Sequence, residues 1–261
     1  MMRVKTFLVI FLVLALGGCN SNTVTNNYIE DKKLDATIIV SSLKTGEEFI
    51  INKERSNQRY LPASAFKIPN TLIVLQEEII KDENDIIRWD GIDKGLFEWN
   101  QDQSLKTALP SSCVWFYQEL AKKVGIEKYS EYLNKISYGN KKVGARVDSF
   151  WLEGDIRISA KEQIDFLKKV YHKEYDFDED NYQILNDLMI EEKNAEYILR
   201  GKTGWAQRVD PQIGWYVGYI ETDKDTWFFA CNLDIRQNSD AGYRKELVFK
   251  YLRELKIIKE L

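Results

Sequence analysis

Residues 60–70 read Tyr-Leu-Pro-Ala-Ser-Ala-Phe-Lys-Ile-Pro-Asn and contain the pattern Ser64-x-x-Lys67. The apolar spacing from Phe66 to Ile80 predicts a helix, and side chains three apart at its start share one face and can meet. Pro69 is compatible with this position because the early N–H groups of a helix have no intrahelical partner. A serine hydroxyl is a weak nucleophile that needs a base. Lysine can serve only where burial or a neighbouring cation keeps its amine neutral.

An isolated Ser-x-x-Lys pattern is weak evidence for a catalytic site. Ser41-Ser-Leu-Lys44 matches the pattern as well, and about one chance match is expected in a chain of this composition. A single match is most often the start of a surface helix. The interpretation of Ser64 and Lys67 therefore depends on what else the chain contains.

The composition narrows the chemistry. The 261 residues, 44% of them hydrophobic, suffice for one well-packed domain or one domain with an insertion. With 37 Lys and Arg against 41 Asp and Glu, the formal net charge of −4 provides no broad basic field for nucleic acid. One His and three scattered Cys lack the spacing of the usual zinc sites. A His-dependent triad would have to use His172, so we expect another base.

Hydrophobic patterning predicts strands near both ends of the chain and helices between them. The expected strands are 36–41 and 48–51, joined by a hairpin at Lys44-Thr-Gly46, and later 197–199, 213–220 and 226–233. The expected helices are 66–80, 113–124, 127–136, 160–171 and a closing helix at 241–255. This order indicates an α/β fold of the α+β type. An antiparallel sheet built from both termini is packed by terminal helices and carries an inserted helical subdomain at about 80–190.

The N-terminal segment has the features of a processing signal. Arg3 and Lys5 precede the apolar run Phe7–Leu16, which is about half the ~20 residues needed to span a bilayer. The run ends in Leu16-Gly-Gly-Cys19, which resembles a bacterial lipobox whose Cys becomes the lipidated N-terminus. The alternative is an ordinary signal peptide with an incidental Cys. We expect a signal peptide over 1–18, a flexible tether over 19–30 and one catalytic domain over 31–261.

Four further motifs follow Ser64 in order. They are Ser112-Cys-Val114, Tyr138-Gly-Asn140, Phe150-Trp-Leu-Glu-Gly154 and Lys202-Thr-Gly-Trp205. With these motifs the chain closely resembles the class D, or oxacillinase-type, serine β-lactamases from about Ala36 to the C-terminus. The resemblance implies a serine β-lactamase/penicillin-binding-like fold and an enzyme that opens the β-lactam ring of penicillin-type antibiotics and confers resistance. The earlier Lys44-Thr-Gly46 is a decoy, that is, a chance match to the motif, because it precedes the nucleophile in the chain.

The resemblance also implies a base that is not histidine. Ser64 is the acylated nucleophile, and Lys67 reacts with carbon dioxide to give a carbamate (N6-carboxylysine), the general base of acylation and deacylation. No cofactor or metal is expected beyond carbon dioxide or bicarbonate. Apolar Val114 beside Lys67 helps to desolvate its amine, which lowers the pKa. Trp151 packs against the carbamate and hydrogen-bonds it.

The remaining roles come from the same resemblance. Ser112 relays a proton to the leaving nitrogen, with Lys202 supplying positive charge beside it. The expected substrate-binding residues are Thr203, Gly204, Trp205 and Arg244. Thr203 and Arg244 bind the substrate carboxylate, and the backbone N–H groups of Ser64 and Trp205 form an oxyanion hole, in which one donor is worth ~3 kcal/mol.

Other interpretations stay open at this point. Taken singly, Tyr138-Gly-Asn140 is typical of a helix-ending turn, and Trp151 and the stripe 115–117 are typical of core. A β-lactam sensor that stays acylated and a cell-wall transpeptidase use similar motifs, although the latter usually has Ser-x-Asn where this chain has Ser112-Cys-Val114. The acidic residues 176–180 are expected in a solvated loop. We expect buried free thiols at Cys113 and Cys231.

The expected partners are small-molecule β-lactams, with no nucleic acid. Contact with a membrane is expected only through a lipid on Cys19. The expected location is the periplasm, at the outer membrane if the source is Gram-negative. The sequence leaves the oligomeric state and the substrate spectrum open, because the spectrum depends on the loops 99–109 and 205–213.

Overall fold

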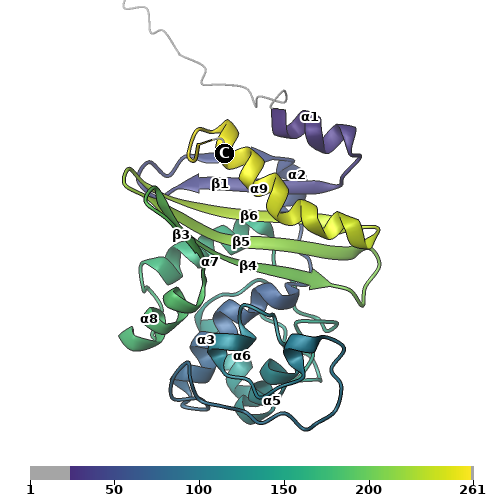
Figure 1. The fold of residues 1–261 in the computed structure, drawn as a ribbon, viewed down its shortest axis with the longest axis vertical. Coiled ribbons are helices and arrows are strands. Elements are labelled where there is room, and N and C mark those ends of the chain that lie inside the picture. The colour runs from purple at the N-terminus through teal and green to yellow at the C-terminus, as the bar shows by residue number, and fades with distance from the viewer. Residues whose placement is uncertain (1–23, 260–261) are drawn as a thin grey trace, which may run out of the picture.

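The computed structural model describes residues 24–259, and its centre is a six-stranded antiparallel sheet (Figure 1). The strand order is β2-β1-β6-β5-β4-β3. The strands are β1 (Ala36–Ser42), β2 (Glu48–Ile51), β3 (Ile190–Lys193), β4 (Tyr197–Ala206), β5 (Gln212–Thr222) and β6 (Thr226–Ile235). Strand β1 pairs with β6, so the two ends of the chain meet in one sheet as the sequence predicts.

Both faces of the sheet are covered by helices. Helix α9 (Tyr243–Glu254) crosses one face, and α7 (Ala160–Tyr171) packs against the other (Figure 1). Every residue of β1 is buried, because alternate side chains enter cores on opposite faces. Ile38 packs in the core under α9, whereas Ile39 belongs to the larger core on the other face. The near-continuous apolar run that indicated this strand is the signature of a strand covered on both sides.

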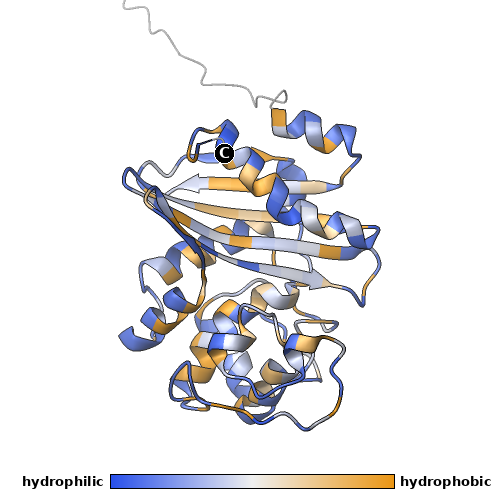
Figure 2. Ribbon diagram, viewed as in Figure 1, coloured by the Kyte–Doolittle hydropathy of each residue, from blue (hydrophilic) through white to orange (hydrophobic). Residues whose placement is uncertain are grey.

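The second half of the molecule is helical and lies beneath the edge of β4 (Figure 1). Its elements are the 3-10 helix η1 (Ala63–Phe66), α3 (Lys67–Gln76), η2 (Phe97–Trp99), α4 (Leu105–Ala108), α5 (Val114–Val124), α6 (Ile126–Lys135) and α8 (Glu179–Leu188). Hydrophobic residues recur along these helices (Figure 2), and many of them are buried in one shared core. Phe66 lies at the centre of this interior and contacts the rings of Tyr138, Phe150 and Trp151. The nucleophile segment is therefore anchored on its apolar side.

The observed fold confirms the expected α+β architecture, and several elements differ from the prediction. Val24–Asp31 forms helix α1 where a flexible tether was expected, because Thr25 and Ile29 are buried and Glu254 accepts hydrogen bonds from the first turn. The expected signal peptide and Cys19 lie outside the described residues. A short helix, α2 (Lys53–Asn57), was not expected; its N-cap Asn52 accepts from a first-turn N–H.

The acidic residues 176–180 are another difference, because only the first of them lies in an exposed loop as expected, and the others begin α8. Asp178 is the N-cap, and Glu179 and Asp180 lie in the first turn. Carboxylates are favoured there because the N-terminus of a helix carries partial positive charge. Strand β4 also differs, because it continues to Ala206, so Lys202-Thr-Gly204 lies within a strand.

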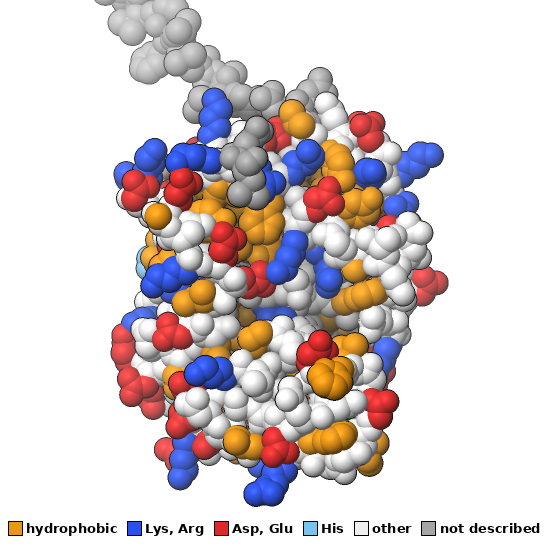
Figure 3. Space-filling model, viewed as in Figure 1, with side chains coloured by type: hydrophobic (Ala, Val, Ile, Leu, Met, Phe, Trp, Pro, Cys, Tyr) orange, Lys and Arg blue, Asp and Glu red, His pale blue; other side chains and the backbone are white. Residues whose placement is uncertain are grey.

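Two surface properties complete the fold. Acidic and basic side chains are interspersed over the face drawn in Figure 3. None of the helices among residues 24–259 has the length and apolar character needed to cross a bilayer. Cys113 and Cys231 are buried free thiols, as expected.

Candidate active site

Ser64 and Lys67 meet at the junction of η1 and α3. The Lys67 ammonium donates to Ser64 Oγ over 3.0 Å. Ala63, directly before the serine, has a φ of 48°, a left-handed conformation that costs energy for a residue with a Cβ. Lys67 is fully buried, whereas 9% of the Ser64 surface is exposed. The hydroxyl is thus reachable from outside while the amine behind it is sealed from water.

The surroundings of Lys67 favour a neutral amine. Burial holds the pKa of Lys67 well below its ordinary value, and the positive charge of Lys202 lowers it further. The ring of Tyr117 lies 5.0 Å from the Lys67 nitrogen. Tyr117 is a site residue that the sequence analysis assigned to core. A signal was present, because Val114 and Tyr117 are three apart on α5 and share a face.

A second serine–lysine pair lies across the site. Lys202 Nζ donates to Ser112 Oγ at 2.5 Å and to the carbonyl of Thr203 at 3.0 Å. Ser112 has a φ of 55°, so the turn before α5 holds this serine in a strained conformation. Burial lowers the pKa of Lys202 to about 7, so near neutral pH this group exchanges a proton readily.

Strand β4 approaches the nucleophile closely because residue 204 is glycine. A Cβ there would lie 2.9 Å from the Pro62 oxygen and 3.1 Å from the Ala65 nitrogen. The N–H of Gly201 donates to Met189 in the segment that leads into β3, and alternate residues of a strand point their N–H groups to the same edge. The N–H of Trp205 therefore points to the edge of β4 that lies beside η1. Ser64 belongs to η1, so this N–H lies on the side of β4 that faces the nucleophile segment.

Arg244 joins the end of α9 to the same stretch of β4. Its guanidinium donates to the carbonyls of Gly204 at 2.8 Å and Ala241 at 2.6 Å, and lies 5.6 Å from the ring of Trp205. The described site thus holds two serines, two buried lysines and an arginine around the edge of one strand. It provides a nucleophile, a base that can be neutral, and cations for an anionic substrate.

The comparisons with known proteins agree over almost the whole chain. The family model described as penicillin binding protein transpeptidase domain matches residues 29–253. The β-lactamase OXA-48 of Klebsiella pneumoniae is 39% identical, over 98% of this chain and 100% of its own length. Two solved structures are also similar, each over 92% of this chain. The class D β-lactamase FUS-1 (OXA-85) of Fusobacterium nucleatum has a TM-score of 0.89 and 39% identity over 100% of its chain. The class D β-lactamase of Sebaldella termitidis has a TM-score of 0.88 and 41% identity over 98% of its chain.

The chain belongs to the class D β-lactamases. It is a serine hydrolase of cyclic amides, which opens β-lactam rings and thereby confers resistance. The transpeptidase family model reflects a fold that these enzymes share with cell-wall enzymes. The relatives that match over nearly their full length are β-lactamases.

Trp151 stands beside the nucleophile of this class D β-lactamase. Its indole stacks on Phe66 with ring centres 5.7 Å apart, and its carbonyl accepts from the N–H of Ala63 over 2.9 Å. The indole N–H of Trp151 is buried and has no partner among the described residues. An unpaired buried donor is costly, so this N–H is available to an acceptor.

The Tyr138-Gly-Asn140 motif supports the site and lies outside it. Gly139 has a φ of 52°, and a Cβ there would lie 2.1 Å from the Arg157 oxygen. Asn140 accepts from the N–H of Arg157 and donates to the carbonyl of Asp155, at 2.9 and 2.8 Å. These bonds fasten the segment that follows Trp151, so the motif braces the wall of the site.

Trp99 is a further residue in the wall of the β-lactamase active site, and the sequence analysis included it only as the first residue of the loop 99–109. The indole N–H of Trp99 donates to the carbonyl of Ser111 over 3.0 Å, and the Trp99 carbonyl accepts from the Trp115 indole over 2.8 Å. Trp99 is thereby fixed to the turn that carries Ser112. The decoy Lys44-Thr-Gly46 instead lies in the exposed turn between β1 and β2, outside this group.

Proposed function

We propose that this enzyme hydrolyses β-lactams through an acyl-enzyme on Ser64, with Lys67 carrying a carbamate as the general base. The observation that carries the proposal is the buried pair of Ser64 Oγ and Lys67 Nζ, 3.0 Å apart. A neutral amine is the form that reacts with carbon dioxide, and burial lowers the pKa of Lys67 toward that form. The unpaired indole N–H of Trp151 supports the proposal, because a carbamate oxygen is an acceptor.

The residues divide the reaction between them. Ser64 Oγ attacks the lactam carbonyl carbon, and its proton passes to the base at Lys67 while the C–N bond breaks. Ser112, hydrogen-bonded to Lys202, delivers a proton to the leaving nitrogen. The carbamate would supply an anionic oxygen that accepts the Ser64 proton and later the proton of the water that hydrolyses the ester.

Charge recognition uses the edge of β4. The N–H groups of Ser64 and Trp205 stabilise the oxyanion, where one donor contributes about 3 kcal/mol. Arg244, Lys202 and the hydroxyl of Thr203 bind the carboxylate that β-lactam antibiotics share. Because Arg244 is already tied to the Gly204 carbonyl, its guanidinium is preorganised for this contact.

The carbamate is tested by removing and restoring bicarbonate. We expect turnover to fall when carbon dioxide is stripped and to recover with bicarbonate, together with a ¹³C carbamate signal that is absent from Lys67→Ala. Trp151→Phe should weaken the bicarbonate affinity, because the indole donor is lost. A rate indifferent to bicarbonate, with no ¹³C signal, would rule out the carbamate.

We also propose that lipid on Cys19 holds the enzyme at a periplasmic membrane face. The support is the lipobox-like sequence Leu16-Gly-Gly-Cys19 after an apolar run. Wild type should fractionate with membranes and incorporate labelled fatty acid, whereas Cys19→Ser should do neither. Equal fractionation of both proteins would favour an ordinary signal peptide.

A further inference from the structure

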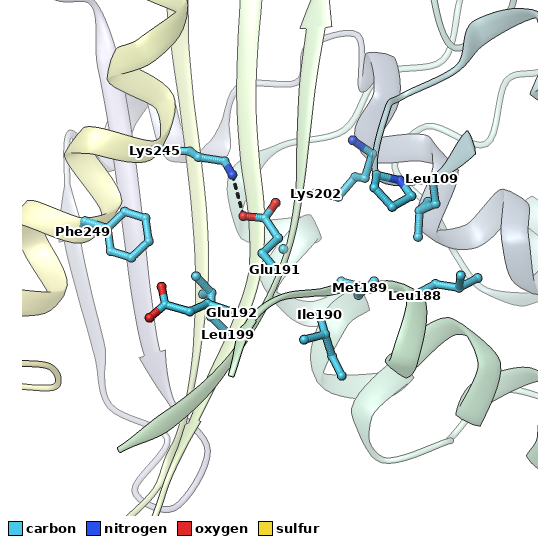
Figure 4. A pocket seen from close by; sticks show the side chains of 12 residues that line it. Leu109, Leu188, Met189, Ile190, Glu191, Glu192, Leu199, Lys202, Lys245 and Phe249 are labelled. Atoms are coloured by element: carbon cyan, nitrogen blue, oxygen red, sulfur yellow. Dashed lines mark hydrogen bonds and ion pairs between the residues drawn. The ribbon is translucent and has the colours of Figure 1, made fainter. Parts of the chain in front are cut away.

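A pocket of about 450 Å³ lies on the side of Lys202 that faces β3 and α9 (Figure 4). Glu191 of β3 extends into it between Lys245 of α9 and Lys202. The Glu191 carboxylate accepts from Lys245 Nζ at 2.5 Å and from the Tyr216 hydroxyl at 2.9 Å. Neither Glu191, Lys245 nor Tyr216 belongs to a motif of the active site.

The charges around Lys202 are mostly positive. Arg244 and Lys245 approach it from α9, and the charge of each lowers the pKa of Lys202, as does its burial. Lys67 on α3 also faces Lys202, but in the proposed mechanism it is a neutral amine or carries the carbamate, so it adds no positive charge. An ammonium in this position therefore needs an acidic partner.

Glu191 is the acid that supplies this compensation. Its negative charge raises the pKa of Lys202, against burial and the charges of Arg244 and Lys245. The turn before α5 contributes the Ser112 hydroxyl, and β5 contributes the Tyr216 hydroxyl, whose proton is bound to Glu191. Glu192 also lines the pocket, but its carboxylate accepts from Tyr197 and Asn194.

We propose that Glu191 is a positioning residue for the reaction: held by Lys245 and Tyr216, its carboxylate favours the ammonium form of Lys202 beside Ser112. This inference rests on the function proposed above, in which an ammonium at Lys202 attracts the substrate carboxylate and supports proton delivery by Ser112. Lys245 has two opposing effects, because it orients Glu191 while its own charge disfavours the ammonium of Lys202. The charge state of Lys202 is thereby set by a pair of residues outside the catalytic motifs.

Two substitutions distinguish an effect of charge from an effect of lost structure, because both break the ion pair between Glu191 and Lys245. Glu191→Gln removes the negative charge, and Lys245→Met removes a positive one. The experiment measures kcat/KM from pH 5.5 to 9.5 in saturating bicarbonate, with an anionic penicillin as substrate. For Glu191→Gln we expect the alkaline limb of the kcat/KM profile to move down by about 1 pH unit. The loss should be about ninefold at pH 8 and shrink to about twofold at pH 6. For Lys245→Met we expect a shift in the opposite direction.

The double variant, Glu191→Gln with Lys245→Met, should return the limb close to its wild-type position. Shifts of the same sign in both single variants, or no shift in either, would overturn the role of Glu191. The ¹³C carbamate signal, recorded on the same samples, separates this outcome from failure of the proposed function. A normal signal with an unmoved limb rejects the inference alone, and a signal missing from wild type rejects the mechanism on which it rests.

Discussion

Ser41–Lys44 and Ser64–Lys67 carry the same Ser-x-x-Lys pattern in different structures. Ser64 and Lys67 lie where η1 passes into α3, so their side chains meet at 3.0 Å. Ser41 is the penultimate residue of strand β1, and its buried hydroxyl has no partner among the described residues. Lys44 lies in the exposed turn that follows. Three residues of helix return a side chain to the same face, whereas three residues of strand and turn do not.

The difference shows that two conditions turn the pattern into a site. The first is a helical start, which brings hydroxyl and amine together. The second is burial of the amine, which is complete for Lys67 with the ring of Tyr117 beside its nitrogen. The segment at 41–44 meets neither condition, and matched substitutions in both segments test whether these two conditions suffice.

The largest contrast is expected between Ser64→Ala and Ser41→Ala. Ser64→Ala removes the nucleophile, so turnover of a chromogenic cephalosporin should fall at least ~10⁴-fold. Ser41→Ala should leave the rate unchanged and the stability equal or up to ~1 kcal/mol higher, because it removes a buried hydroxyl that makes no hydrogen bond. Steady-state rates and urea unfolding measure both. A marked loss of rate in Ser41→Ala would mean that β1 contributes to the site.

The next contrast is between Lys67→Ala and Lys44→Ala. Lys67→Ala should lower turnover about 10³-fold and let the acyl-enzyme accumulate, because the base that activates water is gone. Mass spectrometry during turnover would detect the adduct on Ser64. The exposed Lys44 touches no site residue, so Lys44→Ala should match wild type. Rapid deacylation by Lys67→Ala would show that another group activates the water.

The two Lys-Thr-Gly sequences give a third, smaller contrast. Gly204→Ala forces a Cβ against the Pro62 oxygen, so we expect a stability loss of ~1–3 kcal/mol and an about tenfold or larger loss of kcat/KM. Gly46→Ala meets no atom within 4 Å but requires a φ of 71°, so it should cost ~1 kcal/mol without changing the rate. Thermal melting of both variants measures the cost of backbone strain, and steady-state kinetics detect a displacement of β4. Equal losses of kcat/KM in the two variants would contradict the conclusion that only the Lys-Thr-Gly sequence in the strand serves the active site.

The sequence predicts those parts of the fold that local patterns specify. Three expected elements are present, namely the strand 36–41, the helix 160–171 and the hairpin at 44–46. Patterns of apolar residues and a turn glycine indicate them directly in the sequence. Helix α1 was missed because its stability comes from Glu254, which is far away in the chain. Helix α8 was missed because its acidic first turn resembles a polar loop.

The same division holds for the site. Ser64, Lys67, Ser112 and Lys202 could be found from motifs, and the structure brings them together. Tyr117 was assigned to core because an aromatic residue on a buried helix face serves either purpose. No sequence pattern indicates that β3 brings Glu191 to Lys202, since the contact depends on how β3 pairs with β4.

The smallest expected effect concerns stability and pH. Burial holds the pKa of Lys67 well below its ordinary value of 10.5, so the unfolded chain binds more protons than the folded one between those two values. The stability contributed at Lys67 therefore rises with pH through this window and levels off above 10.5.

In carbonate-free buffer, Lys67→Met should melt above wild type at pH 7. The gap should narrow steadily toward pH 10, because each pH unit inside this window changes the stability by ~1.4 kcal/mol, and ~1 kcal/mol corresponds to about 2–4 °C in a domain of this size. Lys44→Met is the control, and its difference from wild type should stay constant, because that ammonium is in water in both states. If the difference in melting temperature between Lys67→Met and wild type were equally constant, Lys67 would keep its proton when buried. A neutral amine could then no longer explain why the segment 64–67 forms a site and the segment 41–44 does not.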